Sequence, residues 1–218
     1  MAREGGVVST SEVIREGVLL HRPGEPLPEP RPGDLILCHG DRWVHKFVQV
    51  GQRARMLLGR VGTRTKRGRW VHYDHVAVYA GRRAGEPVVI EALPGGVRVT
   101  PLSALDGREY MLLDVSRCAT KGCPPNDPPR DELVAEDAKR RMAVAYVNKC
   151  VGLEYGLVLH YLGMVATTLT AGGVTFSGAQ QEICSSMAAQ AAVRLGHVFD
   201  RPPASTMPAD LMRHFVLP

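Results

Sequence analysis

The stretch VHYDHVAVYAGRRAGEPVVIEALPGGVRVT, residues 71–100, decides the fold. Its apolar, largely β-branched runs are separated by Gly and Pro, which predicts strands over Val71–Ala80, Pro87–Ala92 and Val97–Thr100. The turn between the last two strands is Pro94-Gly-Gly. No segment of helix length separates these strands. We therefore expect an antiparallel sheet or a small barrel, and not a doubly wound parallel sheet.

The pattern changes along the chain from strands to helices. Two more short apolar runs outside this stretch predict further strands, over Asp34–Cys38 and Tyr110–Val115. In the C-terminal half, apolar residues recur at helical spacing. The helices predicted there lie over Leu133–Tyr146, Tyr155–Ala171, Ile183–Leu195 and Pro208–His214. Strands followed by helices are typical of the α+β class.

Prolines mark the expected organisation of the 218 residues. Five prolines between residues 21 and 33 predict an extended, Pro-rich lead-in over residues 1–32. The remainder, 33–218, is expected to form one domain with a strand-rich half (33–117) and a helical half (131–218).

The charge of the chain is unevenly distributed. The formal net charge is only +5, but residues 42–73 hold nine Lys or Arg and no Asp or Glu. The Arg-rich segment 53–70 is therefore a candidate contact for an anionic polymer or surface, such as teichoic acid or anionic lipid. A solvated loop is the alternative. A nucleic-acid partner is not expected, because no helix-turn-helix, RNP or zinc-finger pattern accompanies the segment.

Five cysteines, an odd number, argue against a complete disulfide framework. Cys118 and Cys123 are spaced like half of a metal site, but no second half follows, so neither a metal nor another cofactor is expected. Whether these two form a disulfide stays open.

Composition near the globular average excludes collagen-like, coiled-coil and disulfide-scaffold classes.

The sequence also bears on location. The N-terminus lacks an apolar stretch of signal-peptide length, which predicts a protein that is cytoplasmic at synthesis. The most apolar segment, Tyr155–Ala171, is interrupted by His160, two Gly and three Thr, so no transmembrane span is expected.

Three residues are candidates for chemistry. Cys184 is predicted near a helix N-terminus, where exposed amides and the helix dipole stabilise a thiolate. His75 lies deep in an apolar strand, and Glu91 ends another, where it is placed to orient an imidazole. Each has an ordinary alternative: a small buried thiol, a hydrogen-bonded core histidine, and a carboxylate paired with an arginine.

Five short motifs add to these candidates. In order they are GDLILCHG (33–40), DHVAVYAG (74–81), VVIEALPGGVRVTPLSAL (88–105), GLEYG (152–156) and EICSS (182–186). Their order and spacing resemble the circularly permuted NlpC-like papain-fold proteins, specifically the YiiX-like branch. The likeness runs from about Gly33 to about His214.

The resemblance implies a permuted papain-like cysteine hydrolase with Cys184 as nucleophile, His75 as base and Glu91 as the residue that orients the imidazole. The chain departs from the family pattern at Gly156 and Ser186, where acidic residues are frequent. Neither position belongs to the triad, so these departures bear on substrate contacts.

The expected activity is therefore a thiol-dependent amidase or peptidase acting on peptidoglycan-type peptide amides. Delivery by lysis or in a phage particle would bring such a protein to its substrate. Two alternatives remain. One is a lipid-directed cysteine acyltransferase or lipase, for which the apolar segment Leu157–Leu169 would supply a groove. The other is a binding or structural protein that retains the fold without turnover.

Overall fold

A computed structural model describes residues 12–23, 25, 29–39, 73–93, 95–116, 130–154, 184–199 and 202–216. The strands, in chain order, are β1 (Glu12–Arg15), β2 (Val18–His21), β3 (Leu35–Cys38), β4 (His75–Arg83), β5 (Glu86–Leu93), β6 (Gly96–Pro101) and β7 (Tyr110–Leu113). The α-helices are α2 (Arg130–Cys150), α4 (Cys184–Arg194) and α5 (Pro208–Phe215), with short 3₁₀ turns η2 (Leu102–Leu105) and η3 (Pro203–Ser205). The expected α+β class is confirmed.

All seven strands form one antiparallel sheet in the order β1-β2-β7-β3-β4-β5-β6. The outermost strands, β1 and β6, do not pair with each other, so the described sheet is open. The alternative of a small barrel is therefore wrong. Closure requires hydrogen bonds between the two outermost strands, and these strands lie at opposite edges of the sheet.

The two N-terminal strands were not anticipated. They form a hairpin around Glu16-Gly17, in which Gly17 takes a positive φ of 75°. β2 then pairs with β7, so part of the segment predicted as a lead-in, residues 1–32, belongs to the sheet. The Pro-rich stretch that motivated that prediction begins only where β2 ends.

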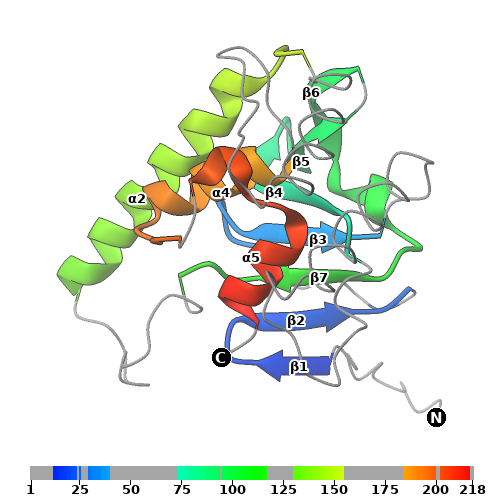
Figure 1. Cartoon of the computed structure of the whole chain (residues 1–218), viewed down its shortest axis with the longest axis horizontal. Coiled ribbons are helices and arrows are strands. Elements are labelled where there is room, and N and C mark those ends of the chain that lie inside the picture. Colours follow the sequence, from blue (N-terminus) through cyan, green and yellow to red (C-terminus); the bar gives the residue numbers. More distant parts are fainter. Residues whose placement is uncertain are drawn as a thin grey trace, which may run out of the picture.

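The three α-helices lie on one side of the sheet, as Figure 1 shows. Alternate strand residues, among them Leu35, Val76 and Ile90, pack with Met187 of α4 and Phe215 of α5 in one buried cluster. The intervening residues, including Ile36, Ala77 and Val89, form a second cluster with η2. Because both faces of the central strands are buried, their sequences read as continuous apolar runs.

The bounds of β4 differ from the prediction. The strand begins at His75 rather than Val71 and continues to Arg83. It passes Gly81, which has a φ of 90°, through an irregularity in the register opposite β5. A glycine expected to end the strand instead bends it, because glycine adopts a conformation that other residues rarely adopt.

A buried arginine fixes α2 to the sheet. The Arg140 guanidinium donates to the carboxylates of Asp34 and Asp114 at 2.8 and 2.9 Å, and its Nε donates to Glu136 at 2.9 Å. It also donates to the Pro32 carbonyl. A charge this deeply buried is tolerated because every side of the guanidinium is paired.

His197 holds the C-terminal end of α4 in place. Its Nε2–H donates to the Val115 carbonyl at 2.9 Å, and its Nδ1 accepts from His214 of α5 at 3.1 Å. Burial lowers the pKa of His197 to about 4, despite the opposing effect of the Val115 carbonyl. The ring is therefore neutral in the folded protein at neutral pH.

This burial predicts acid sensitivity. Between about pH 6.5 and about pH 4, His197 takes up a proton in the unfolded chain but not in the folded one, so the free energy of unfolding decreases as the pH falls. We expect a loss of about 2 kcal/mol between about pH 7 and about pH 5. His197→Gln should be less stable at neutral pH and lose this part of the pH dependence. Urea unfolding at both pH values measures the difference, and an unchanged slope in the variant would contradict the assignment.

Some predictions fall outside the described residues. They are the helix over Tyr155–Ala171, the Arg-rich segment 53–70 and the pairing of Cys118 with Cys123.

Candidate active site

The candidate nucleophile begins a helix. Cys184 is the first residue of α4, and only 6% of it is exposed. The next residue, Ser185, donates through its hydroxyl to the Thr206 carbonyl at 2.6 Å, which ties the first turn of α4 to the segment before α5. The thiol is thus held at the positive end of a helix dipole.

The candidate base and its partner come from neighbouring strands. His75 begins β4, and Glu91 lies on β5 directly opposite Ala77, two residues along from His75. Residues two apart on a strand share a face, so the imidazole and the carboxylate are diagonal neighbours. The His75 Nε2–H donates to Glu91 Oε2 at 2.8 Å, and both side chains are about 95% buried.

A third strand completes the surroundings of the carboxylate. Thr100 on β6 donates its hydroxyl to Glu91 Oε1 at 2.6 Å. Arg98, directly opposite Glu91, places its Nε 3.8 Å from the same oxygen. Neither residue is predicted from the sequence as part of the site. Both belong to the alternating run Val-Arg-Val-Thr (97–100), and only the register of β6 against β5 shows which face they share with Glu91.

The imidazole also interacts with the thiol. Interaction with the Cys184 side chain is among the causes that raise the pKa of His75, so the thiol is a neighbour of the ring. Since Glu91 accepts from Nε2–H, Nδ1 is the ring nitrogen left to take the thiol proton. The three residues singled out from the sequence are therefore brought together.

Charge favours a protonated ring beside an ionised carboxylate. Burial alone would lower the pKa of His75, but its interactions with the Cys184 and Glu91 side chains hold it well above its usual value. Burial alone would raise the pKa of Glu91, but hydrogen bonds from His75 and Thr100, together with Arg98, keep it below its usual value. This is the arrangement that stabilises an imidazolium.

A second thiol lies beside the same ring. Cys38, the last residue of β3, is directly opposite His75 and fully buried. Burial raises the pKa of the Cys38 thiol to about 11, so this thiol stays protonated near neutral pH. Of the two cysteines, Cys184 is the better candidate for a nucleophile.

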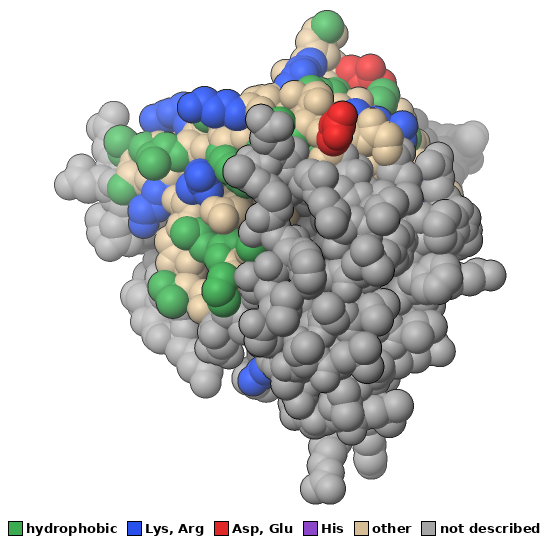
Figure 2. Space-filling model, turned by 45° about the horizontal axis from the view of Figure 1, so that its top comes forward, with side chains coloured by type: hydrophobic (Ala, Val, Ile, Leu, Met, Phe, Trp, Pro, Cys, Tyr) green, Lys and Arg blue, Asp and Glu red, His purple; other side chains and the backbone are tan. Residues whose placement is uncertain are grey.

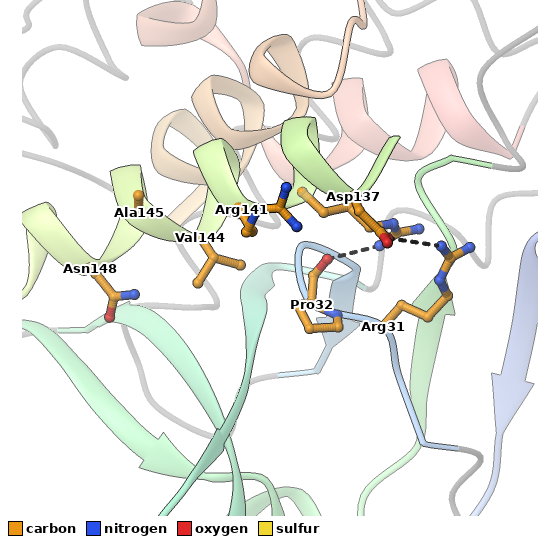
Figure 3. Close-up of a pocket in the computed structure, with 8 residues that line it drawn as sticks. Arg31, Pro32, Asp137, Arg141, Val144, Ala145 and Asn148 are labelled. Atoms are coloured by element: carbon orange, nitrogen blue, oxygen red, sulfur yellow. Dashed lines mark hydrogen bonds and ion pairs between the residues drawn. The ribbon is translucent and has the colours of Figure 1, made fainter. Parts of the chain in front are cut away.

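A pocket among the described residues lies elsewhere. It measures about 360 Å³ and lies between α2 and the chain before β3. Figure 3 shows Arg31 and Pro32 on one side and Arg141, Val144 and Asn148 on the other. Pro32 precedes β3, whereas Cys38 ends it, so the pocket is at the other end of this strand from His75. It contains none of the three candidate residues.

On the face shown in Figure 2, the described Lys and Arg side chains stand between hydrophobic and uncharged ones, without forming a continuous basic surface. Within the described ranges, no cluster of three or more His, Cys, Asp or Glu is arranged to hold a metal ion. The described helices also include none with the length and apolar character needed to cross a membrane.

Comparison with known proteins gives no relative for this chain: no family model, no curated protein and no solved structure matches it.

Proposed function

We propose that this chain is a thiol-dependent hydrolase that cleaves amides through Cys184, His75 and Glu91, in a permuted papain-like arrangement. One observation carries the proposal: a helix-N-terminal thiol acts on an imidazole that donates to a buried carboxylate. A cysteine nucleophile needs this combination of a base and a group that orients the base. The order of the three along the chain is the one that the resemblance implies.

The proposed reaction is acyl transfer. Nδ1 of His75 takes the proton of the Cys184 thiol, and Glu91 stabilises the resulting imidazolium through Nε2–H. The thiolate attacks the amide carbonyl, and the backbone N–H at Cys184 contributes to binding the oxyanion. The imidazolium gives its proton to the leaving amine, leaving a thioester on Cys184. Water, deprotonated by His75, then releases the acid and restores the thiol.

The substrate class rests on the resemblance alone. Peptidoglycan-type peptide amides are the proposed substrates, and release by lysis or carriage in a phage particle is the proposed route to them. The competing lipid-directed activity depends on Leu157–Leu169, which lies outside the described residues, so no described contact favours it.

Alkylation of Cys184 tests the proposal without a choice of substrate. We expect iodoacetamide to label Cys184 well below pH 8.5, the approximate pKa of a free cysteine, and His75→Ala to lose this low-pH reactivity. Peptide mass spectrometry over a pH series measures the labelling of each cysteine separately. Buried Cys150, at the end of α2, serves as the internal control. Labelling of Cys184 that follows an ordinary thiol titration in both proteins would contradict the proposal.

A further inference from the structure

The pocket between α2 and the chain before β3 is separate from the candidate active site, and its volume is about 360 Å³. Small-molecule sites in proteins measure about 300–1,000 Å³, so the pocket is large enough for a small ligand. One face of α2 forms one wall, with side chains at the spacing i, i+3, i+4, i+7 that places them together: Arg141, Val144, Ala145 and Asn148. Pro32 belongs to the facing wall, as Figure 3 shows.

Arg140 joins the two walls of this pocket. Its Nη1 donates to the Pro32 carbonyl and to the Asp34 carboxylate, both at 2.8 Å, and its side chain is only 4% exposed. Its remaining N–H groups donate to three further side chains, those of Glu136, Asp114 and Ser116. All five N–H donors of the guanidinium are therefore bonded within the protein, so Arg140 fixes the walls and has no donor left for a ligand.

Two other charged side chains of the pocket, Asp137 and Arg141, are not used in this way. They lie one helical turn apart, at positions i and i+4 of α2. The Asp137 side chain is 63% exposed and lies 4.0 Å from Arg31, which binds Glu136 more closely, at 2.7 Å. Within the part of the chain that the structure describes, Arg141 has no hydrogen bond and no ion pair. The pocket thus presents one carboxylate and one guanidinium side by side.

We propose that this pocket binds a free α-amino acid with an apolar side chain. The Arg141 guanidinium pairs with the α-carboxylate of the ligand, and the Asp137 carboxylate pairs with its α-ammonium group. A ligand that carries only a carboxylate is repelled by Asp137, and a ligand that carries only an ammonium group is repelled by Arg141. Only a ligand with both charges close together matches both residues. This inference does not depend on the proposed function.

The rest of the pocket suits an apolar side chain. Val144 and Ala145 lie one turn beyond Arg141 along α2, and Pro32 lines the facing wall. These three side chains offer no charge and no side-chain hydrogen-bonding group. The next polar residue on this face is Asn148, seven positions after Arg141, which is about 10 Å along the helix axis. The apolar surface between them is long enough for the side chain of an amino acid such as leucine.

The test is a titration of the full chain with L-leucine, followed by saturation-transfer NMR of the ligand. We expect saturable binding of L-leucine, and binding of glycine about tenfold weaker or more, because glycine has no apolar side chain to bury. Arg141→Gln and Asp137→Asn should each weaken the binding of L-leucine by about tenfold or more, since each removes a charged hydrogen-bonding partner. Arg213→Gln, which changes an exposed arginine of α5, is the matched control and should bind as the wild type does. Circular dichroism checks that each variant is folded.

Two analogues of leucine assign each charge of the ligand to its partner. L-Leucinamide lacks the carboxylate, so it should bind the wild type more weakly than L-leucine, and Arg141→Gln should not weaken it further. N-acetyl-L-leucine lacks the ammonium group, so it should also bind more weakly, and Asp137→Asn should not weaken it further. Crossing the variants with the analogues in this way isolates each pair of charges.

Three results would overturn the inference. The first is L-leucine that shows no saturation in the wild type at about 10 mM, where a Kd of about 1 mM would be evident. The second is equal binding of L-leucine by the wild type and both pocket variants. The third is N-acetyl-L-leucine that binds as tightly as L-leucine, because the pocket would then recognise a carboxylate alone. None of these results bears on the alkylation of Cys184, since the pocket contains none of the candidate catalytic residues.

Discussion

Cys184→Ala is expected to abolish acyl transfer. The assay is p-nitrophenyl acetate, a small activated ester that makes no assumption about the natural acyl group. The wild type should release one rapid equivalent of p-nitrophenolate as the acetyl group is transferred to Cys184, followed by slower turnover. In Cys184→Ala the rapid equivalent should disappear and the rate should fall by about 10⁴-fold or more, since no other group replaces a missing nucleophile.

Two measurements make this result specific to one thiol. Peptide mass spectrometry should place the acetyl group on Cys184 and on no other cysteine. Cys150→Ala, which removes another buried free thiol, should keep the rapid phase. An acetyl group found on Cys38, or a rapid phase that persists in Cys184→Ala, would refute the assignment of the nucleophile.

The elements that could be predicted from the sequence are those whose ends are marked by residues next to them in the chain. The β5 and α4 predictions lie within a residue of the observed ends because turn residues bound a β-branched run in one case, and a glycine follows a helical pattern in the other. The β1–β2 hairpin was missed because β2 is buried through its pairing with β7, some 90 residues away. The barrel alternative was wrong because closure depends on both sheet edges at once, which local patterns do not report.

The residues of the site also fall into two groups, those that the sequence reveals and those that only the strand pairing reveals. Cys184, His75 and Glu91 were identified by residue type and by motif order, which are visible in the chain itself. Thr100, Arg98 and Cys38 were not, because their proximity depends on the registers of β6 with β5 and of β3 with β4. A change of register by one residue would turn Thr100 to the other face of the sheet. Neighbours of this kind become visible only once the strand pairing is known.

Glu91→Gln is expected to slow the reaction, because it removes the negative charge of the side chain and nearly keeps its shape. Glutamine has almost the volume of glutamate and can still accept a hydrogen bond from His75 or Thr100. It cannot stabilise an imidazolium as a carboxylate does, so the pKa of His75 should fall and the thiolate–imidazolium pair should become less populated. We expect acetylation of Cys184 at about pH 7 to slow by about 10²–10⁴-fold.

The direction in which the pH profile of alkylation shifts shows whether Glu91 acts through its charge or only by holding His75 in position. In Glu91→Gln the His75 imidazolium is less populated and therefore stabilises the Cys184 thiolate less. The onset of alkylation should then move to higher pH, towards the free-thiol value of about 8.5. Thr100→Val keeps the charge and removes only the 2.6 Å hydrogen bond to Glu91 Oε1, so it should slow acetylation with a smaller shift in pH. A Glu91→Gln protein with the wild-type pH profile would show that the carboxylate does not act on the Cys–His pair. In that case the buried His75–Glu91 bond would hold β4 to β5 and do nothing for the reaction.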